Sequence, residues 1–206
     1  MPETKIKILR GASSLFMKFG FKSITMDDIA RELGISKKTL YQYFEDKTKL
    51  VDEAVEQHLQ EEINCCEEIK KQGSDPVSFI LNITDSISER DKQINPSVLF
   101  DLKKYFKPAW DKLYGFRTNY VYNKILSNLE QGKKKGFYNK DINEKLIARL
   151  YIHLIDFLIS PELYMNESKD FQEVHFEIIK YHLRGICTEK GLEILNEKLK
   201  KKVLKK

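Results

Sequence analysis

The sequence predicts an all-α protein, with a three-helix domain of helix-turn-helix type at the N-terminus and a larger helical bundle after it. Apolar residues recur at intervals of three and four over most of the 206 residues, which is the period of an amphipathic helix. Strand signals are almost absent, because the chain has no Asn-Gly or Asp-Gly hairpin turn and its β-branched residues do not alternate over any useful length.

The first helix is expected over residues 4–19, where the apolar period is regular and Gly20 follows as a stop signal. This helix should pack across the two short helices that come next. The predicted core of the three-helix domain consists of Leu15, Phe16, Phe19, Ile24, Ile29, Leu33, Leu40 and Phe44.

The two short helices have clear start and stop signals. Thr25 is a favourable N-cap, and Asp28 three positions later can complete a capping box. Gly34 can end that helix in the left-handed conformation. Ser36 can then cap the next helix, over residues 37–44. Two short helices joined by such a tight turn form a helix-turn-helix, whose second helix enters the major groove of DNA.

The second short helix is poor in apolar side chains, since only Leu40 and Phe44 share its inner face. Phosphate contacts need lysines, hydroxyls and backbone amides at a helix start, and base reading needs hydrogen-bonding side chains nearby. A solvated surface turn is the alternative, but the cap, the turn glycine and the apolar spacing together favour DNA binding. The predicted DNA-binding residues are Thr25, Ser36, Lys37, Lys38, Thr39, Tyr41, Gln42, Tyr43 and Lys47.

The rest of the chain predicts a helical body. Asp46 should cap a long helix over residues 47–71, and Pro76 and Pro96 each stand at a first helical position. Further helices are expected at 76–90, at 96–105, from Pro108 to about Gln131, at 142–159 and at 168–187, with a charged amphipathic helix or tail at 189–204. Gly132 and Gly136 bracket three lysines, which predicts a solvated turn. The expected domains are 1–50 for DNA binding and 51–206 for effector binding and dimerisation.

The charge is unevenly distributed along the chain. Residues 1–50 hold ten Lys and Arg against six Asp and Glu, residues 51–197 hold 20 against 25, and the last nine residues add six lysines and no acid. A basic N-terminal domain and an acidic body suit a protein that meets DNA with one end only. Because no apolar stretch is long enough to span a bilayer and no signal peptide is evident, we expect a cytoplasmic protein without a membrane partner.

Neither a cofactor nor a metal is expected. Cys65 and Cys66 are adjacent and Cys187 is distant, which disfavours a disulfide framework. His58 and Cys65 lie seven residues apart on one helix, about 10 Å along its axis, which is too far to share one ion easily. The lysine-rich C-terminus is most simply a helix end in solvent.

Two other functional classes compete with DNA binding. An enzyme is disfavoured, because the chain lacks a glycine-rich phosphate loop, a Gly-x-Ser-x-Gly elbow and a His-Glu-x-x-His pair. His175 and His182, seven residues apart, fit a pH-sensitive dimer contact better than catalysis. The second alternative is a helical interaction protein whose helix-turn-helix serves protein contacts.

The N-terminal region resembles the TetR family of bacterial transcriptional regulators. The resemblance covers Ile8 to about Leu50 and is carried by Thr-Met-Asp-Asp-Ile-Ala, Leu-Gly-Ile-Ser, Thr-Leu-Tyr-Gln-Tyr-Phe and Asp-Lys-Thr-Lys-Leu, in that order. It implies a homodimer that binds a near-palindromic operator in double-stranded DNA, most often represses, and is released by a small-molecule effector. Lys47 matches a lysine that often holds a phosphate, whereas Lys38 stands where many members have a glycine or small residue.

The resemblance also implies an effector site and a dimer interface in the body. An aromatic-rich segment suits a small apolar or aromatic effector, with ordinary packing as the alternative. The candidate effector residues are Phe100, Tyr105, Phe106, Trp110, Tyr114 and Tyr120. The last two major helices would form the dimer interface, although internal packing is plausible for half of their apolar residues. The candidate interface residues are Leu146, Leu150, Leu154, Phe157, Phe171, Val174 and Ile178.

Overall fold

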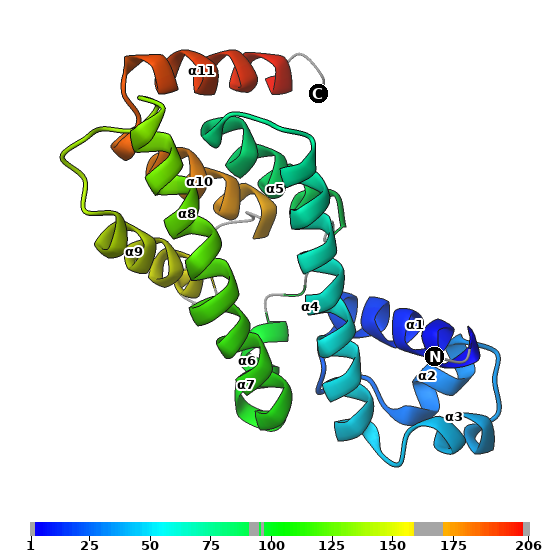
Figure 1. Cartoon of the computed structure of the whole chain (residues 1–206). Coiled ribbons are helices and arrows are strands. Elements are labelled where there is room, and N and C mark those ends of the chain that lie inside the picture. The colour runs from blue at the N-terminus through cyan, green and yellow to red at the C-terminus, as the bar shows by residue number, and fades with distance from the viewer. Residues whose placement is uncertain (1–2, 91–94, 96, 159–170, 204–206) are drawn as a thin grey trace. The chain divides into compact units, whose positions relative to one another are not determined.

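The computed structural model describes residues 3–90, 95, 97–158 and 171–203, and it confirms the all-α prediction (Figure 1). The elements are α1 (Glu3–Phe19), α2 (Met26–Glu32), α3 (Lys37–Tyr43), α4 (Lys47–Lys71), α5 (Pro76–Arg90), α6 (Ser97–Tyr105), α7 (Lys107–Gly115), a π-helix (Phe116–Val121), α8 (Tyr122–Lys134), α9 (Glu144–Phe157), α10 (Phe171–Ile186) and α11 (Glu189–Val203). None of these helices combines the length and the apolar content that crossing a lipid bilayer requires.

The chain divides into two compact units. The head unit comprises the residues up to 63 together with the segment 93–116, and the body unit comprises residues 64–92 and 117–206. The division falls inside α4, so this helix contributes to both units. The boundary predicted at residue 50 concerns function and stays a prediction, but the packing shows that α6 and α7 belong with the helix-turn-helix.

The core of the head unit is mostly the predicted one. Phe16, Ile29, Leu40 and Phe44 are fully buried, and Leu15, Ile24 and Leu33 pack at the edge. The prediction for Phe19 is wrong, because its side chain is 46% exposed. Gly20 adopts a left-handed conformation (φ 86°) and reverses the chain, so that Phe21 enters the core and stacks on Phe16 at a centroid distance of 4.8 Å.

The helix α6 packs directly against the turn that follows α1. Gly20 suits this site because its φ is positive, and an added Cβ would also lie 2.8 Å from Oγ of Ser97, which would have to rotate away. The carboxylate of Asp101, which is buried, accepts a hydrogen bond of 2.9 Å from the backbone N–H of Lys22. Phe106 completes the contact from the end of α6, because its ring is buried in the head core. The turn between α1 and α2 is therefore anchored to α6.

The core of the body unit is organised around a buried tyrosine. Tyr138 has no exposed surface, and its hydroxyl donates a hydrogen bond of 2.9 Å to Oδ1 of Asn128. Gly132 lies inside α8 against the Tyr138 ring, where an added Cβ would come within 2.0 Å of a ring carbon. The expectation that Gly132 opens a turn is wrong, since this glycine provides space for a ring that follows it in the sequence.

The lysine run after Gly132 is not simply a solvated turn. Lys133 and Lys134 belong to the last turn of α8, and the chain reverses only at Gly136, which has φ 76°. The ammonium group of Lys133 pairs with the carboxylate of Glu144 at 2.8 Å and donates to the carbonyl of Ile142 at 2.8 Å. This lysine joins the end of α8 to the start of α9.

The helix predicted from Pro108 to Gln131 is interrupted. A π-helix over Phe116–Val121 separates α7 from α8. Arg117 at this position is buried and forms an ion pair of 2.8 Å with Asp156 on α9. A π-helical turn accommodates one more residue than an α-helical turn, and such turns are found mostly as short insertions. The partner of Arg117 lies far along the chain, so helical periodicity gives no sign of the interruption.

The two histidines of α10 are buried in the body unit. His175 is 4% exposed and His182 is 8% exposed, so the interpretation of the pair as a dimer contact is wrong. The ring of His182 meets the ring of Tyr151 edge-on, with 5.1 Å between their centroids. Burial lowers the pKa of His182 to about 4 from its ordinary value near 6.5.

The buried His182 should make the protein less stable in mild acid. Because the unfolded chain takes up a proton near pH 6.5 and the folded chain only near pH 4, the stabilisation is complete above pH 6.5 and is lost as the pH falls toward 4. We expect His182 to account for about 2 kcal/mol of the unfolding free energy lost between pH 7 and pH 5. His182→Phe keeps an aromatic ring beside Tyr151 and should remove that part of the loss, as measured by urea denaturation. Equal losses in the two proteins would contradict the assignment.

Candidate nucleic-acid interface

The start of α2 is fixed by the predicted capping box. The hydroxyl of Thr25 accepts a hydrogen bond of 3.1 Å from the backbone N–H of Asp28, and the carboxylate of Asp28 accepts one of 3.0 Å from the backbone N–H of Thr25. The same carboxylate also pairs with Arg31 at 2.6 Å. The hydrogen bonds from Thr25 lower the pKa of Asp28, with a smaller contribution from Arg31. Thr25 itself is exposed.

The turn between α2 and α3 also follows the prediction. Gly34 has φ 63°, and the next backbone N–H, that of Ile35, donates to the carbonyl of Ala30 at 3.0 Å. Ser36 then caps α3, because its hydroxyl accepts from the backbone N–H of Thr39 at 3.0 Å. The first turn of α3 is thus held by its own side chains while Ser36 stays exposed.

The helix α3 turns one face to the head core and the other to solvent. Leu40 is fully buried, and Thr39 and Tyr43 are half-buried, with Tyr43 at the edge of the core. Tyr41 is 50% exposed. The other exposed side chains of this segment are those of Ser36, Lys37, Lys38 and Gln42. Since only one α3 side chain is fully buried, the helix is attached by a narrow apolar contact and keeps its polar groups available.

Three lysines of this region differ in their surroundings. Lys37 forms an ion pair of 2.5 Å with Asp27, at the start of α2. Within the part of the chain that the structure describes, no carboxylate pairs with Lys38. Lys47, the first residue of α4, is half-buried. Lys38 is therefore the α3 lysine most readily available to a phosphate, a distinction from Lys37 that the residue types alone do not predict.

Lys47 is held in place by groups of the head unit. Its ammonium group donates to the backbone carbonyl of Lys22 at 3.4 Å and lies 5.6 Å from the centroid of the Phe106 ring. Burial lowers the pKa of Lys47, and the nearby carboxylates of Asp101 and Asp28 offset part of that effect. A cation that is partly desolvated and already positioned loses little conformational freedom when it binds a phosphate.

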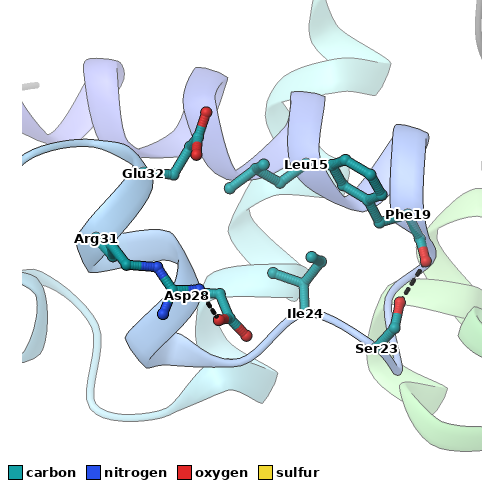
Figure 2. A pocket seen from close by; sticks show the side chains of 7 residues that line it. All are labelled: Leu15, Phe19, Ser23, Ile24, Asp28, Arg31 and Glu32. Atoms are coloured by element: carbon teal, nitrogen blue, oxygen red, sulfur yellow. Dashed lines mark hydrogen bonds and ion pairs between the residues drawn. The ribbon is translucent and has the colours of Figure 1, made fainter.

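A cavity in the head unit lies between α1 and α2 (Figure 2). Leu15, Phe19 and Ile24 supply its apolar wall, and the side chains of Asp28, Arg31 and Glu32 stand on the α2 side. Ser23, whose hydroxyl bonds to the carbonyl of Phe19, closes one end. This pocket is open to solvent, Phe19 lies on its exposed wall, and none of the candidate effector residues lines it.

The candidate effector residues do not share one environment. Phe106 is part of the head core, and Trp110 packs at its edge. Phe100, Tyr105 and Tyr114 are 41–51% exposed on α6 and α7. Tyr120 lies in the body unit, on the π-helix. An effector site formed by these residues stays a prediction.

The candidate dimer residues form a partly exposed apolar row. On α9, Leu146, Leu150 and Phe157 are 48–54% exposed. Leu154, Val174 and Ile178 are half-buried, and the side chain of Phe171, the first residue of α10, lies outside the described residues. Tyr181 on α10, which is not among the predicted residues, is 74% exposed and lies three residues after Ile178, on the same helical face.

Comparison with known proteins gives a family match confined to the N-terminal region. Residues 8–54 match the family model described as "Bacterial regulatory proteins, tetR family". The chain is 29% identical over 184 residues to the helix-turn-helix-type transcriptional regulator YvaF of Bacillus subtilis (strain 168), a match that covers 89% of this chain and 95% of the relative. It is also 37% identical over 51 residues to IcaR of Staphylococcus aureus (strain Newman), the negative transcriptional regulator of the biofilm operon icaADBC. This second match covers 25% of this chain and 27% of IcaR.

Solved structures share the fold over nearly the whole chain. A putative transcriptional regulator from Saccharomonospora viridis in complex with choline aligns with a TM-score of 0.74 and 20% identity, covering 92% of this chain and 100% of that one. A TetR-family transcriptional regulator from Agrobacterium tumefaciens aligns with a TM-score of 0.73 and 20% identity, covering 91% and 100%. Likeness at this identity shows a common arrangement of helices.

Proposed function

We propose that this chain, a TetR-type transcriptional regulator, acts as a homodimer that binds a near-palindromic operator, represses transcription from it and is released by a small-molecule effector. The observation that carries the proposal is the exposed polar face of α3, presented beside two capped helix starts. Lys38, Tyr41 and Gln42 have no structural task in the head core and are exposed. Side chains of these types at a helix start are those that contact phosphates and base edges. The negative regulator IcaR, which the N-terminal region resembles, supports repression.

The dimer is proposed from the apolar row of α9 and α10. Leu146, Leu150 and Phe157 are each about half exposed, as is typical of side chains that a partner subunit covers. One helix-turn-helix contacts only a few base pairs. In a two-fold symmetric dimer each subunit contacts one half-site, so the DNA site is twice as long and its half-sites have a fixed spacing. The site would then be a near-palindrome, in the cytoplasm where bacterial DNA lies.

The effector is proposed to be small and either apolar or aromatic. The choline complex of the Saccharomonospora viridis regulator supports the idea that a protein of this fold holds a small molecule. An effector shifts the equilibrium only if it binds the arrangement that does not bind DNA more tightly than the arrangement that does. The sequence feature that supports an apolar or aromatic ligand is the aromatic-rich segment between Phe100 and Tyr120.

The test is selection of bound fragments from the source genome by purified protein, followed by titration of the shared sequence. We expect the fragments to share a near-palindrome and the affinity to fall steeply with salt, because phosphate contacts release counterions. Lys47→Ala should weaken binding to operator and to random DNA alike by about tenfold. It should also lower the salt slope, which is the slope of the logarithm of the binding constant against the logarithm of the salt concentration, by about 1 for each lysine removed. The matched control is Lys190→Ala, which removes an exposed lysine of the body unit that lies over the Phe137 ring.

Enrichment of no shared sequence would overturn the proposal. A DNA affinity that does not change with salt concentration would instead favour the alternative of a helical protein whose helix-turn-helix serves protein contacts. If Lys47→Ala binds DNA as tightly as Lys190→Ala, Lys47 is not a phosphate contact.

A further inference from the structure

Two lysines from different elements converge on one exposed tyrosine. The ammonium group of Lys22, in the turn after α1, lies 5.1 Å from the centroid of the Tyr105 ring, and that of Lys104 lies 5.4 Å from it. Lys104 also lies 5.3 Å from the centroid of the Phe100 ring. Both rings are more than 40% exposed. Two like charges are therefore gathered at an aromatic surface that faces solvent.

These charges are not neutralised within the described residues. No carboxylate there forms an ion pair with the ammonium group of Lys22 or Lys104. The nearest acidic side chain on α6, Asp101, is buried and uses its carboxylate to bind the backbone N–H of Lys22. An aromatic face attracts a cation but does not cancel its charge. The two ammonium groups, Lys22 before Lys104, also hold the pKa of the Tyr105 hydroxyl below its ordinary value.

The same surface continues to the proposed phosphate contact at Lys47. The Lys47 ammonium group donates to the carbonyl of Lys22 and lies over the ring of Phe106, the residue next to Tyr105. We call this continuous set the basic-aromatic surface; its residues are Lys22, Lys47, Phe100, Lys104 and Tyr105. Because α6 is anchored to the turn after α1, the surface belongs to the head unit.

We propose that the basic-aromatic surface binds backbone phosphates of the operator duplex just outside the base pairs that α3 contacts. The proposal rests on the proposed function. Lys22 and Lys104 lie outside the base-reading helix α3, and the Lys22 carbonyl is bonded to Lys47, the proposed phosphate contact, so these two lysines would meet the backbone instead of base edges. A phosphate neutralises the two ammonium groups and accepts hydrogen bonds from them and from the Tyr105 hydroxyl. This contact adds affinity without adding sequence preference.

The test compares two duplexes, one that ends at the operator and one with about one helical turn of extra DNA on each side. Wild-type protein should bind the longer duplex more tightly. The double variant Lys22→Gln and Lys104→Gln should lose about tenfold in affinity for the longer duplex and less than about twofold for the short one. Its salt slope on the longer duplex should fall by about 2 to 4, since each lysine of a dimer releases about one counterion.

A matched control is Lys190→Gln, which removes another lysine that lies over an aromatic ring, at 4.1 Å from the Phe137 centroid. It should bind both duplexes as the wild type does. Circular dichroism and the urea midpoint establish that the double variant folds. If the double variant binds both duplexes like the wild type, or loses equally on both, the basic-aromatic surface is not a flanking-phosphate site. Wild-type protein that binds no operator would instead contradict the proposed function, so the two failures are distinguishable.

Discussion

Replacing Tyr41 with alanine should weaken operator binding by about 100-fold and reduce the preference for operator over single-base variants. Tyr41 is half exposed on α3 and contributes nothing to the fully buried part of the head core. A side chain that contacts a base edge contributes about 1–3 kcal/mol to discrimination, and the proposed dimer loses the contact twice. Fluorescence anisotropy titrations with operator and variant duplexes measure both effects.

The urea midpoint of Tyr41→Ala should match that of the wild type, because an exposed side chain is removed. A matched comparison is Lys38→Ala, which we expect to weaken operator and variant duplexes to the same degree if Lys38 contacts phosphate only. Unchanged affinity in Tyr41→Ala would show that α3 does not read DNA through this side chain.

Gly132→Ala should destabilise the body unit by about 3 kcal/mol, the upper end of what overpacking a core costs. The added methyl group would lie 2.0 Å from one ring carbon of Tyr138 and 2.3 Å from another. The ring cannot move aside easily, because it is fully buried and its hydroxyl is bonded to Asn128. The change should lower the urea midpoint and release the tyrosine from its buried environment, as near-ultraviolet circular dichroism reports.

Gly115→Ala is the control for this substitution. Gly115 is the last residue of α7, and a Cβ atom there would meet nothing within 4 Å. Alanine in such a helical position is neutral or slightly stabilising. If both glycine variants have the wild-type midpoint, the close approach of Gly132 and Tyr138 is not part of the folded protein.

The parts of the fold that the sequence predicts correctly depend on local chemistry. The capping box at Thr25, the left-handed Gly34 and the cap at Ser36 each act through bonds to residues three to five positions away. Such signals are complete within a short window, so the helix-turn-helix and the exposed face of α3 are predictable from the order of residues alone.

The features that the sequence does not predict depend on contacts with residues far along the chain, or on a side chain that folds back onto the helix before it. Gly132 has the pattern of a turn residue, and only the position of the Tyr138 ring beside it shows that it provides space. Arg117 in the π-helix pairs with Asp156 on α9, and Lys22 lies over the ring of Tyr105 on α6. Composition marks Tyr105 only as one aromatic residue among several, which favours an effector interpretation. Asp101 is the one acid among the apolar and basic residues of α6, but only the structure shows that it accepts a hydrogen bond from the backbone N–H of Lys22.

The ion pair between Lys37 and Asp27 bears on how tightly the proposed regulator would hold DNA of any sequence. In the free protein the Asp27 carboxylate is already paired with the Lys37 ammonium group, so a phosphate that binds Lys37 competes with an internal anion. Because both side chains are more than half exposed, breaking the pair costs at most about 1 kcal/mol, and the cost is the same on operator and on random DNA. Under the proposed function, an Asp27→Asn protein would therefore bind both kinds of duplex slightly more tightly and keep the same ratio between them.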